Sequence, residues 1–368
     1  MTELASDGTL ELRFDEAPLA SPGECEVLIR LEAAPINPSD IKHMFCMLPP
    51  AALAVEGEGF AARARGRLEP QALAQHAGRI GVALPCGNEG AGLVVAAGAD
   101  PAAQALIGRR VAVSPGGMFA DYRIAPARDC IVLREHLAAP HGAAAWVNPL
   151  TALAMIETMR REGHQALLLT AAASSLGRML NRLCRAEDIA LVNVVRAPRQ
   201  ADLLRREGAT QVCDTSQPDF DQQLQQAIAD TGATLAFDAT GGGVLAGRIL
   251  RAMDRALSQS AGAYSHYGST QHKQLYFFGG LNPEPVQFRR DFGMAWGMGG
   301  WLLQSALARF GEERVAAMKA RVAGEIETTF ATQFARQIPH SAILDLANCS
   351  AYMKLSSGGK FLVTMASG

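Results

Sequence analysis

Short apolar runs separated by turn residues characterise the first part of the chain. The segments 26–31 (EVLIRL), 92–96 (GLVVA) and 110–113 (RVAV) are typical of β-strands, and Gly and Pro residues interrupt the sequence between them. Short strands with frequent turns predict a partly closed β-barrel over residues 1–145. The Ala-rich stretch 51–83 shows no regular pattern, yet it is too varied for a low-complexity segment.

The pattern changes after Trp146. Residues 148–161 have helical spacing, and short apolar runs then alternate with helix-like stretches. Such alternation is the pattern of a parallel, doubly wound sheet, so we predict an α/β domain of the Rossmann type. A long amphipathic helix is expected at about 312–327. The apolar runs are 166–170, 191–195, 211–213, 235–238 and 276–278.

The last apolar run, 360–365 (KFLVTM), is typical of a strand that lies outside this alternation. A strand has to pair, and the β-rich N-terminal region is its expected partner. We therefore predict a β-rich domain from residues 1–145 and 328–368, and an α/β domain from 146–327.

Charge and composition serve mainly to argue against certain partners and against a signal peptide. At 368 residues the chain exceeds the usual size of a single core, in agreement with two domains. The formal net charge is −2 and the basic residues are scattered among acidic ones, which argues against nucleic acid or a membrane surface as a partner. Residues 1–10 lack the basic start and apolar run of a signal peptide, so we expect a cytoplasmic protein.

Neither the cysteines nor the longest uncharged segment points to a special environment. The seven cysteines lie far apart without a CxxC spacing, which predicts reduced, mostly buried thiols and no metal clip. Residues 292–308 carry no charge, but the segment is shorter than the ~20 residues that cross a bilayer. It also contains four glycines, and we expect it to be buried in protein.

Small residues connect the strand 166–170 to a helix that runs through Cys184. Small side chains let a pyrophosphate approach the helix N-terminus, where N–H groups and the helix dipole stabilise negative charge. The same residues would also suit a tightly packed turn without a ligand. The candidate phosphate-binding residues are Ala173, Ser174, Ser175, Leu176 and Gly177.

Arg196 ends the next strand, where a dinucleotide-binding fold places the residue that contacts the adenosine ribose. An acidic residue there would bind the 2′-hydroxyl of NAD, whereas a guanidinium offers a bidentate partner to the 2′-phosphate of NADP. Arg199 is a second candidate partner of that phosphate. The sequence therefore favours NADP(H), although Arg196 could also be an ordinary surface charge.

Two further loops follow predicted strands at the edge of the sheet where ligands bind. Thr240 and Gly241 come after the strand 235–238 and are candidates to contact the ribose or the pyrophosphate. Gly279 and Gly280 come after the strand 276–278 and would leave room for the nicotinamide, unless they are simple turn glycines.

Several motifs in a fixed order resemble one known family, the medium-chain dehydrogenase/reductases, and within it the zinc-free quinone oxidoreductase and enoyl reductase branch. The resemblance implies a GroES-like catalytic domain built from both chain ends, a Rossmann-type NADP(H) domain and a homodimer. It assigns Asn148 and Thr151 to the cofactor and places Asn37 and Asp40 near the nicotinamide. The motifs are 36–40 (INPSD), 87–92 (GNEGAG), 148–153 (NPLTAL), the turn 171–177, and 193–196 (NVVR).

Zinc-dependent members of that family would carry a ligand Cys near Asn37 and a ligand His at the position of Asn88. Amide side chains are poor zinc ligands, so we predict no metal. The resemblance then implies acceptors that take a hydride without a Lewis acid, such as quinones and other conjugated carbonyls. Asn37 could bind the acceptor oxygen or the nicotinamide ribose, but Asn-Pro is also a common start of a turn.

A proton donor is harder to assign. Tyr264, His266 and Tyr267 form the densest cluster of proton-competent side chains, and one of them, Tyr264 or Tyr267 first, could act as a general acid, although an ordinary solvated loop is the slightly favoured interpretation. Enoyl reductases place a Tyr where this chain has Leu48, which argues against an enoyl thioester reductase. A non-enzymatic NADPH-binding redox sensor is the other alternative. The segments 41–85 and 255–309 are longer than in typical relatives, so the acceptor is not predicted.

Overall fold

Both ends of the chain build one unit, and the middle of the chain builds the other. The computed structural model describes residues 1–260, 265–354 and 359–365. Unit 1 consists of Met1–Val147 and Lys319–Gly368, and unit 2 of Asn148–Met318. The second boundary lies inside helix α11 (Glu312–Glu325), whereas the pattern placed it after residue 327. The reason is Lys319, whose Nζ donates to the Arg128 carbonyl at 2.7 Å and attaches the end of the helix to unit 1.

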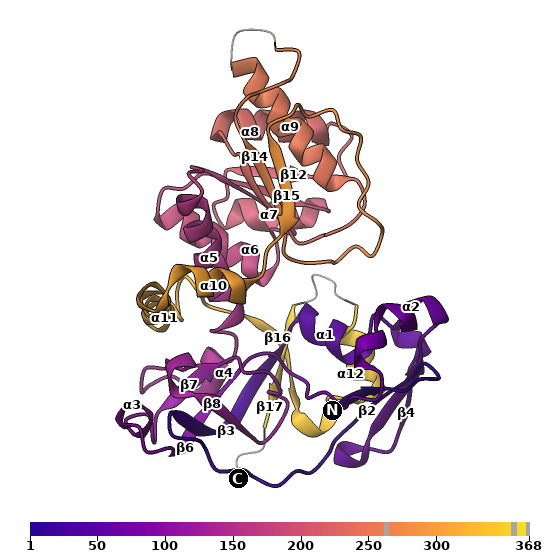
Figure 1. Cartoon of the computed structure of the whole chain (residues 1–368), viewed down its shortest axis with the longest axis vertical. Coiled ribbons are helices and arrows are strands. Elements are labelled where there is room, and N and C mark those ends of the chain that lie inside the picture. Colours follow the sequence, from indigo (N-terminus) through magenta and orange to yellow (C-terminus); the bar gives the residue numbers. More distant parts are fainter. Residues whose placement is uncertain (261–264, 355–358, 366–368) are drawn as a thin grey trace. The chain divides into compact units, whose positions relative to one another are not determined.

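Unit 1 is organised around the long central strand β3 (Glu26–Ile36), which pairs antiparallel with three other strands. One of them is the C-terminal strand β17, in which Phe361 lies opposite Ile36 and Thr364 opposite Ala33. The predicted pairing of the two chain ends is confirmed (Figure 1). The other strands of this sheet are β6 (Gly90–Ala97), β7 (Arg110–Val113), β8 (Tyr122–Pro126), β9 (Ile131–Val132), β16 (Phe334–Pro339) and β17 (Lys360–Thr364).

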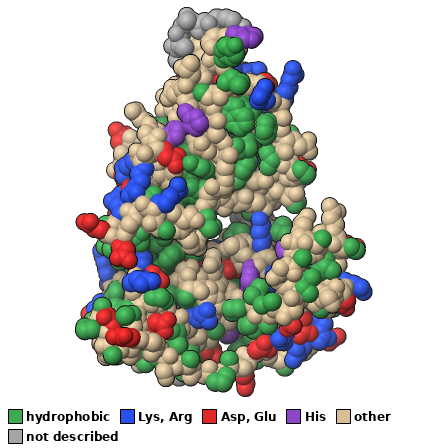
Figure 2. Space-filling view, viewed as in Figure 1, with side chains coloured by type: hydrophobic (Ala, Val, Ile, Leu, Met, Phe, Trp, Pro, Cys, Tyr) green, Lys and Arg blue, Asp and Glu red, His purple; other side chains and the backbone are tan. Residues whose placement is uncertain are grey.

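A second, four-stranded sheet of unit 1 contains part of the Ala-rich stretch whose pattern was irregular. Strand β5 has the sequence RARGR, in which Ala64 is buried and the arginines on either side are exposed. Arg65 Nε binds Glu11 Oε2 at 2.6 Å across the strand pair, and Figure 2 shows acidic and basic side chains interspersed on the molecular face that it draws. In order, the strands are β1 (Thr2–Leu4), β2 (Thr9–Arg13), β5 (Arg63–Arg67) and β4 (Ala54–Glu56).

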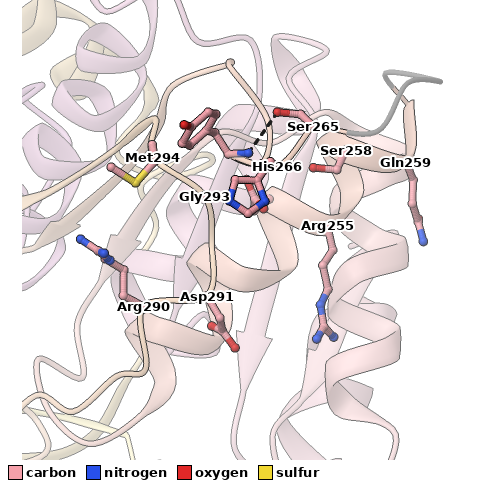
Figure 3. Close-up of a pocket in the computed structure, with 12 residues that line it drawn as sticks. Arg255, Ser258, Gln259, Ser265, His266, Arg290, Asp291, Gly293 and Met294 are labelled. Atoms are coloured by element: carbon pink, nitrogen blue, oxygen red, sulfur yellow. Dashed lines mark hydrogen bonds between the residues drawn. The ribbon is translucent and has the colours of Figure 1, made fainter.

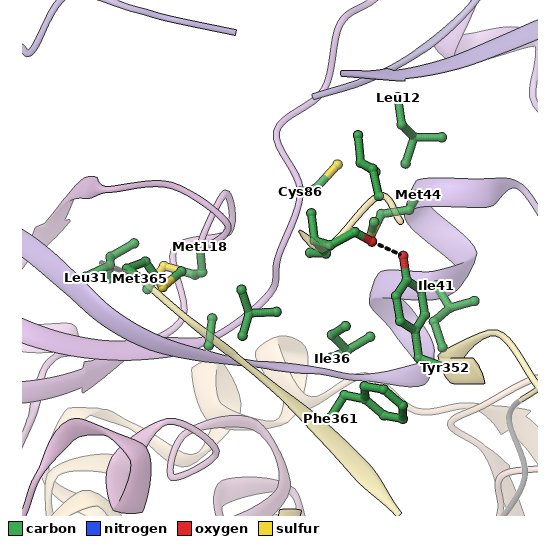
Figure 4. Packing of buried hydrophobic residues seen from close by; sticks show 14 of the residues in the cluster. Leu12, Leu31, Ile36, Ile41, Met44, Cys86, Met118, Tyr352, Phe361 and Met365 are labelled. Carbon is green, nitrogen blue, oxygen red and sulfur yellow. Dashed lines mark hydrogen bonds between the residues drawn. The ribbon is translucent and has the colours of Figure 1, made fainter. Parts of the chain in front are cut away.

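The core of unit 1 joins apolar side chains from both sheets and from helices, α1 and α12 among them (Figure 4). Ile41 and Met44 come from α1, and Tyr352 comes from α12. The Tyr352 hydroxyl donates to the Ile343 carbonyl at 2.8 Å, so its polar atom is satisfied inside the core. The helices are α1 (Pro38–Phe45), α2 (Pro70–Gln75), α3 (Pro101–Gln104), α4 (Ala139–Gly142) and α12 (Leu346–Tyr352).

Unit 2 is the predicted doubly wound domain, and the α/β fold class is confirmed. Its six parallel strands lie in the order β12-β11-β10-β13-β14-β15. Strands are added on one side of β10 up to β12 and on its other side from β13 onward, so the strand order reverses between β10 and β13. Ligands of such sheets bind beyond the carboxyl ends of the strands at this reversal. The strands are β10 (Leu167–Thr170), β11 (Leu191–Val195), β12 (Gln211–Asp214), β13 (Leu235–Asp238), β14 (Lys273–Phe277) and β15 (Trp296–Gly300).

Helices connect the strands of unit 2, and the uncharged segment 292–308 takes part in this architecture. It supplies the edge strand β15, paired with β14, and the start of α10. No helix among the described residues is both long and apolar enough to span a bilayer. The helices are α5 (Val147–Arg161), α6 (Ser175–Ala186), α7 (Pro198–Arg206), α8 (Phe220–Thr231), α9 (Leu245–Ser260) and α10 (Leu303–Phe310).

Helix α6 begins very close to the strand that precedes it. A Cβ atom added to Gly177 would lie 2.1 Å from the carbonyl oxygen of Ala172, which is backbone and cannot rotate away. The close approach of helix and turn therefore requires glycine at this position.

We expect Gly177→Ala to lower the free energy of unfolding by about 1–3 kcal/mol, because the new methyl group forces the backbone apart. Thermal denaturation would measure the loss. Gly300→Ala in the same unit is the matched control, since a Cβ atom added there would have no other atom within 4 Å. Equal melting temperatures of the two variants would contradict the close packing.

Candidate functional site

The turn between β10 and α6 has the backbone of an anion-binding loop. Ala171 adopts a left-handed conformation with φ of 50°, which turns the chain sharply after the strand. Ser174 is the N-cap of α6, and its hydroxyl accepts the Gly177 N–H at 3.2 Å. The remaining N–H groups of the first helical turn have no acceptor within the helix, so they suit a negatively charged group. The small residues at 171–177 therefore fit a pyrophosphate.

Arg196 follows β11 directly and is exposed. Its backbone N–H donates to Gln200 Oε1 at 3.1 Å, which fixes the start of α7 beside it. Arg199 lies in the first turn of the same helix and is also exposed. The structure thus places two arginines just beyond the carboxyl end of the strand next to β10, the position that the sequence predicted for a 2′-phosphate contact.

Asp238 organises the next loop, a role that the sequence pattern did not reveal. Its carboxylate is fully buried at the end of β13 and accepts the Thr170 hydroxyl at 2.6 Å and the Thr240 N–H at 2.8 Å. The Thr170 oxygen in turn accepts the Ala239 N–H at 2.8 Å. This network joins the carboxyl ends of β10 and β13, so Thr240 is held in a defined place at the carboxyl edge of the sheet.

The glycines in this region have a packing reason. A Cβ on Gly241 would lie 2.3 Å from the Gly279 carbonyl oxygen, and a Cβ on Gly279 would lie 2.6 Å from the Ala239 carbonyl oxygen. The two loops also share hydrogen bonds, since Asn282 N donates to the Thr240 carbonyl at 2.8 Å. Close contact between the loops therefore explains Gly241 and Gly279, and their part in cofactor binding stays a prediction.

Asn37 and Asp40 lie together in unit 1, where they form the capping box of α1. The Asp40 carboxylate accepts the Asn37 N–H at 2.7 Å, and both side chains are buried. Asn37 stands at the N-cap position between β3 and α1, and its contact with an acceptor or with the nicotinamide ribose stays a prediction.

Glu89 and Lys360 complete this buried group, and sequence reasoning missed both. Glu89 Oε1 accepts Asn37 Nδ2 at 3.0 Å and lies 3.5 Å from Lys360 Nζ. Its other oxygen accepts the N–H groups of Trp146 at 3.1 Å and Val147 at 2.8 Å. One carboxylate therefore ties together four segments of unit 1. The GNEG motif contains Glu89, but nothing in this local sequence indicates that the charged side chain is buried.

Burial shifts the pKa values of Asp40 and Lys360. Desolvation, with the nearby Glu89 carboxylate, raises the pKa of Asp40 to about 7, although the Asn37 N–H and Lys360 act in the opposite direction. Desolvation also lowers the pKa of Lys360, against the attraction of Glu89 and Asp40. Unit 1 thus holds a carboxyl group that changes charge near neutral pH.

The family's zinc-ligand positions hold amides in contact with neighbouring polar groups. Asn88 Nδ2 lies 3.4 Å from the Ser39 hydroxyl, and the backbone carbonyl of Asn88 accepts the Ser114 hydroxyl at 2.8 Å. Within the described ranges no three His, Cys, Asp or Glu side chains are close enough to hold a metal ion. Leu48 packs against the apolar core of unit 1 and offers no proton.

The tyrosine cluster requires a correction. Tyr264 lies outside the described residues. His266 and Tyr267 lie in the loop before β14, so they stand at the amino edge of the parallel sheet, where they line a pocket (Figure 3). The loops with Ser174, Arg196 and Thr240 follow the carboxyl ends of strands. The sheet itself separates Tyr267 from those loops, so Tyr267 is not placed to protonate a substrate beside a cofactor bound there.

Asn148 and Thr151 both lie near the start of α5, where Thr151 is buried and Asn148 is half-buried. Their assignment to the cofactor came from the resemblance alone and stays a prediction. Gly280 lies in the loop after β14, next to Gly279.

We expect Asp40→Asn to remove a pH dependence of stability. The raised pKa means that the folded protein binds this proton more tightly than the unfolded chain does, so the free energy of unfolding falls as the pH rises from about 4 to about 7. The total fall would be at most about 4 kcal/mol. Asn stays neutral and keeps the acceptor oxygen, so its variant should show a flatter profile in urea denaturation across this range. The exposed Glu16→Gln serves as control and should retain the slope of the parent chain.

Comparison with known proteins agrees with this architecture. Residues 23–135 match the model of the alcohol dehydrogenase GroES-like domain. A curated relative, the synaptic vesicle membrane protein VAT-1 homolog of Rattus norvegicus, is 26% identical over 158 residues, which are 42% of this chain. The matched region spans only 39% of that protein.

Solved structures match over almost the whole chain. A protein of Mesorhizobium loti assigned as an NADPH:quinone reductase has a TM-score of 0.71 at 24% identity, covering 99% of this chain and 97% of its own. The quinone oxidoreductase of Escherichia coli, solved with NADPH, has a TM-score of 0.67 at 16% identity and covers 99% of both chains. The CurK enoyl reductase has a TM-score of 0.71 at 15% identity and covers 99% of this chain and 98% of its own.

These similarities confirm the fold that the resemblance implied, including the GroES-like domain of unit 1. The chain therefore has the fold of these reductases, and residues 23–135 match the alcohol dehydrogenase GroES-like domain.

Proposed function

We propose that this protein is an NADPH-dependent reductase that passes a hydride to a quinone or another conjugated carbonyl compound. The observation that carries the proposal is the arrangement at the carboxyl edge of the unit 2 sheet, where the Ser174-capped turn and Arg196 follow adjacent strands. The likeness in fold to NADPH-complexed oxidoreductases supports the same cofactor.

Each part of this edge would bind one part of the cofactor. The first turn of α6 would hold the pyrophosphate through its N–H groups and the helix dipole. Arg196, with Arg199 next to it, would bind the 2′-phosphate through charge-assisted hydrogen bonds. The loop that Asp238 fixes would support the ribose. When bound, NADPH supplies the hydride.

The acceptor class follows from what the catalytic unit offers. Asn37 and Asn88 are amides and poor zinc ligands, so we propose an acceptor whose conjugation lets it take a hydride directly. The apolar packing of Leu48 removes the Tyr donor expected of an enoyl thioester reductase. Because Asp40 is buried and its carboxylate binds the Asn37 N–H, we propose that solvent supplies the proton. A homodimer and a cytoplasmic location stay predictions of the sequence.

We expect Arg196→Ala to weaken NADPH binding by roughly ten- to a hundredfold, because a charge-assisted bond to the 2′-phosphate contributes about 1.5–3 kcal/mol. NADH lacks this phosphate, so its affinity should not change. Calorimetric titration of both nucleotides would measure the contrast. Arg206→Ala, an exposed arginine at the other end of α7, is the matched control. Equal losses for NADPH and NADH would contradict the assignment.

Stopped-flow oxidation of NADPH against quinones, enones and enoyl thioesters tests the reaction. We expect rapid oxidation with quinones or enones and slow oxidation with enoyl thioesters. Fast turnover of enoyl thioesters alone would favour the enoyl reductase alternative. Tight NADPH binding without any turnover would favour a non-enzymatic redox sensor.

A further inference from the structure

The imidazole ring of His340 is buried in unit 1 without an ordinary hydrogen bond. His340 begins η5 (His340–Ala342), and its side chain is only 7% exposed. Within the part of the chain that the structure describes, neither Nδ1 nor Nε2 makes a hydrogen bond of normal geometry. Most buried polar side chains are hydrogen-bonded, so an imidazole in this state requires a physical explanation.

Two phenylalanine rings enclose this imidazole. The Phe14 and Phe60 rings each meet His340 edge to face, with centroids 5.3 and 5.5 Å from the imidazole, and they meet each other at 5.1 Å. Phe14 follows β2, and Phe60 lies in η2 (Gly59–Ala61). Three segments that are far apart in the sequence therefore meet through these rings, which we call the His340 cluster.

The His340 cluster lies at the surface of unit 1, since Phe60 is 58% exposed. The turns beside it carry hydrogen bonds of short range. The Ala62 N–H donates to the Gly59 carbonyl at 3.2 Å, and the Ile343 N–H donates to the His340 carbonyl at 3.2 Å. Segments with exposed side chains and local hydrogen bonds open at a low cost in free energy. The cluster can therefore open while the rest of unit 1 stays folded.

The surroundings of the imidazole favour its neutral form. Burial lowers the pKa of His340, and the N-terminal amino group acts in the same direction. The Asp121 carboxylate, whose Oδ1 lies 3.9 Å from His340 Nδ1, and the Phe119 carbonyl oppose this shift without reversing it. The Asp121 side chain is 73% exposed, and water weakens its attraction for a charged ring.

Charged side chains next to the two phenylalanines do not replace this partner. Arg13 and Asp15 lie on either side of Phe14 in the sequence and pair with each other, with Arg13 Nε 2.9 Å from Asp15 Oδ1. Glu58, which precedes η2, is exposed. A protonated imidazole within the cluster would therefore depend on the exposed Asp121 for compensation.

We propose that His340 is a proton-operated latch of unit 1. In its neutral form the ring completes the His340 cluster and holds η2, η5 and the end of β2 together. A proton taken up from solvent makes the ring a cation, which is less stable between two phenylalanine rings than in water, so the cluster opens. All three rings belong to unit 1, and the latch does not depend on the proposed cofactor or acceptor.

Acidification should open the latch. The ring has the ordinary histidine pKa of about 6.5 when it is open to water and a lower pKa when it is enclosed. The open form therefore binds the proton more tightly, and its population grows as the pH falls below about 6.5. Between pH 7.5 and pH 5.5 the equilibrium constant for opening rises by at most about tenfold. The Asp40 carboxyl acts in the opposite direction, because its protonation stabilises the fold.

Hydrogen exchange of the full chain, with millisecond labelling and mass spectrometry, tests the proposal once the rates are corrected for the intrinsic effect of pH. Peptides that contain Ala62 or Ile343 should lose protection several-fold between pH 7.5 and pH 5.5. His340→Phe keeps an aromatic ring that takes up no proton, so this loss should disappear. His141→Gln, at an exposed histidine of unit 1, is the matched control and should retain the loss.

Asp121→Asn provides a second test should His340→Phe fail to fold. The carboxylate favours the protonated ring inside the closed cluster, so its removal should enlarge the loss of protection when the pH is lowered further to about 4.5. The proposal is overturned when protection of the two peptides does not change with pH, when His340→Phe keeps the full response, or when Asp121→Asn reduces it. An equal loss in all peptides of unit 1 would also refute a local latch.

Discussion

The antiparallel pairing of β17 with β3 is the constraint on which the rest of the architecture depends. It brings the last strand of the chain to the long central strand of the first unit, with Phe361 opposite Ile36. Because β3 and β17 belong to the two ends of the sequence, the segment between them has to leave unit 1 and return to it. Unit 2 is therefore an insertion, and its two connections are the start of α5 and the helix α11.

Within each unit a buried carboxylate fixes the loops around it. Asp238 accepts the Thr170 hydroxyl and the Thr240 N–H at the end of β13, and Glu89 accepts the Asn37 amide and two backbone N–H groups in unit 1. A carboxylate removed from water is costly unless several donors surround it, so each of these groups requires its partners in place. The candidate residues Thr240 and Asn37 are accordingly held in place by these carboxylates.

The parallel sheet of unit 2 gives its two edges different chemistry. At the carboxyl edge, the α6 N-terminus and Arg196 lie in positions suited to phosphate groups. At the amino edge, an open pocket is lined by residues of α9 and of the loops before β14 and β15, among them Asp254, which pairs with the buried Lys273.

The sequence by itself determined the two-domain α/β architecture, the strands with apolar runs and the pairing of the C-terminal strand, because burial of a strand or helix leaves a local periodic pattern. It also located the turn before α6 and Arg196, since both follow a strand at fixed spacing. Only the tertiary structure decided the partners of polar groups, such as Glu89 with Lys360, which come from distant parts of the chain. It also revealed β5, a strand without an apolar run, and placed Tyr267 at the amino edge of the sheet. Such features depend on contacts between segments that are distant in the sequence, and the local hydrophobic pattern does not encode these contacts.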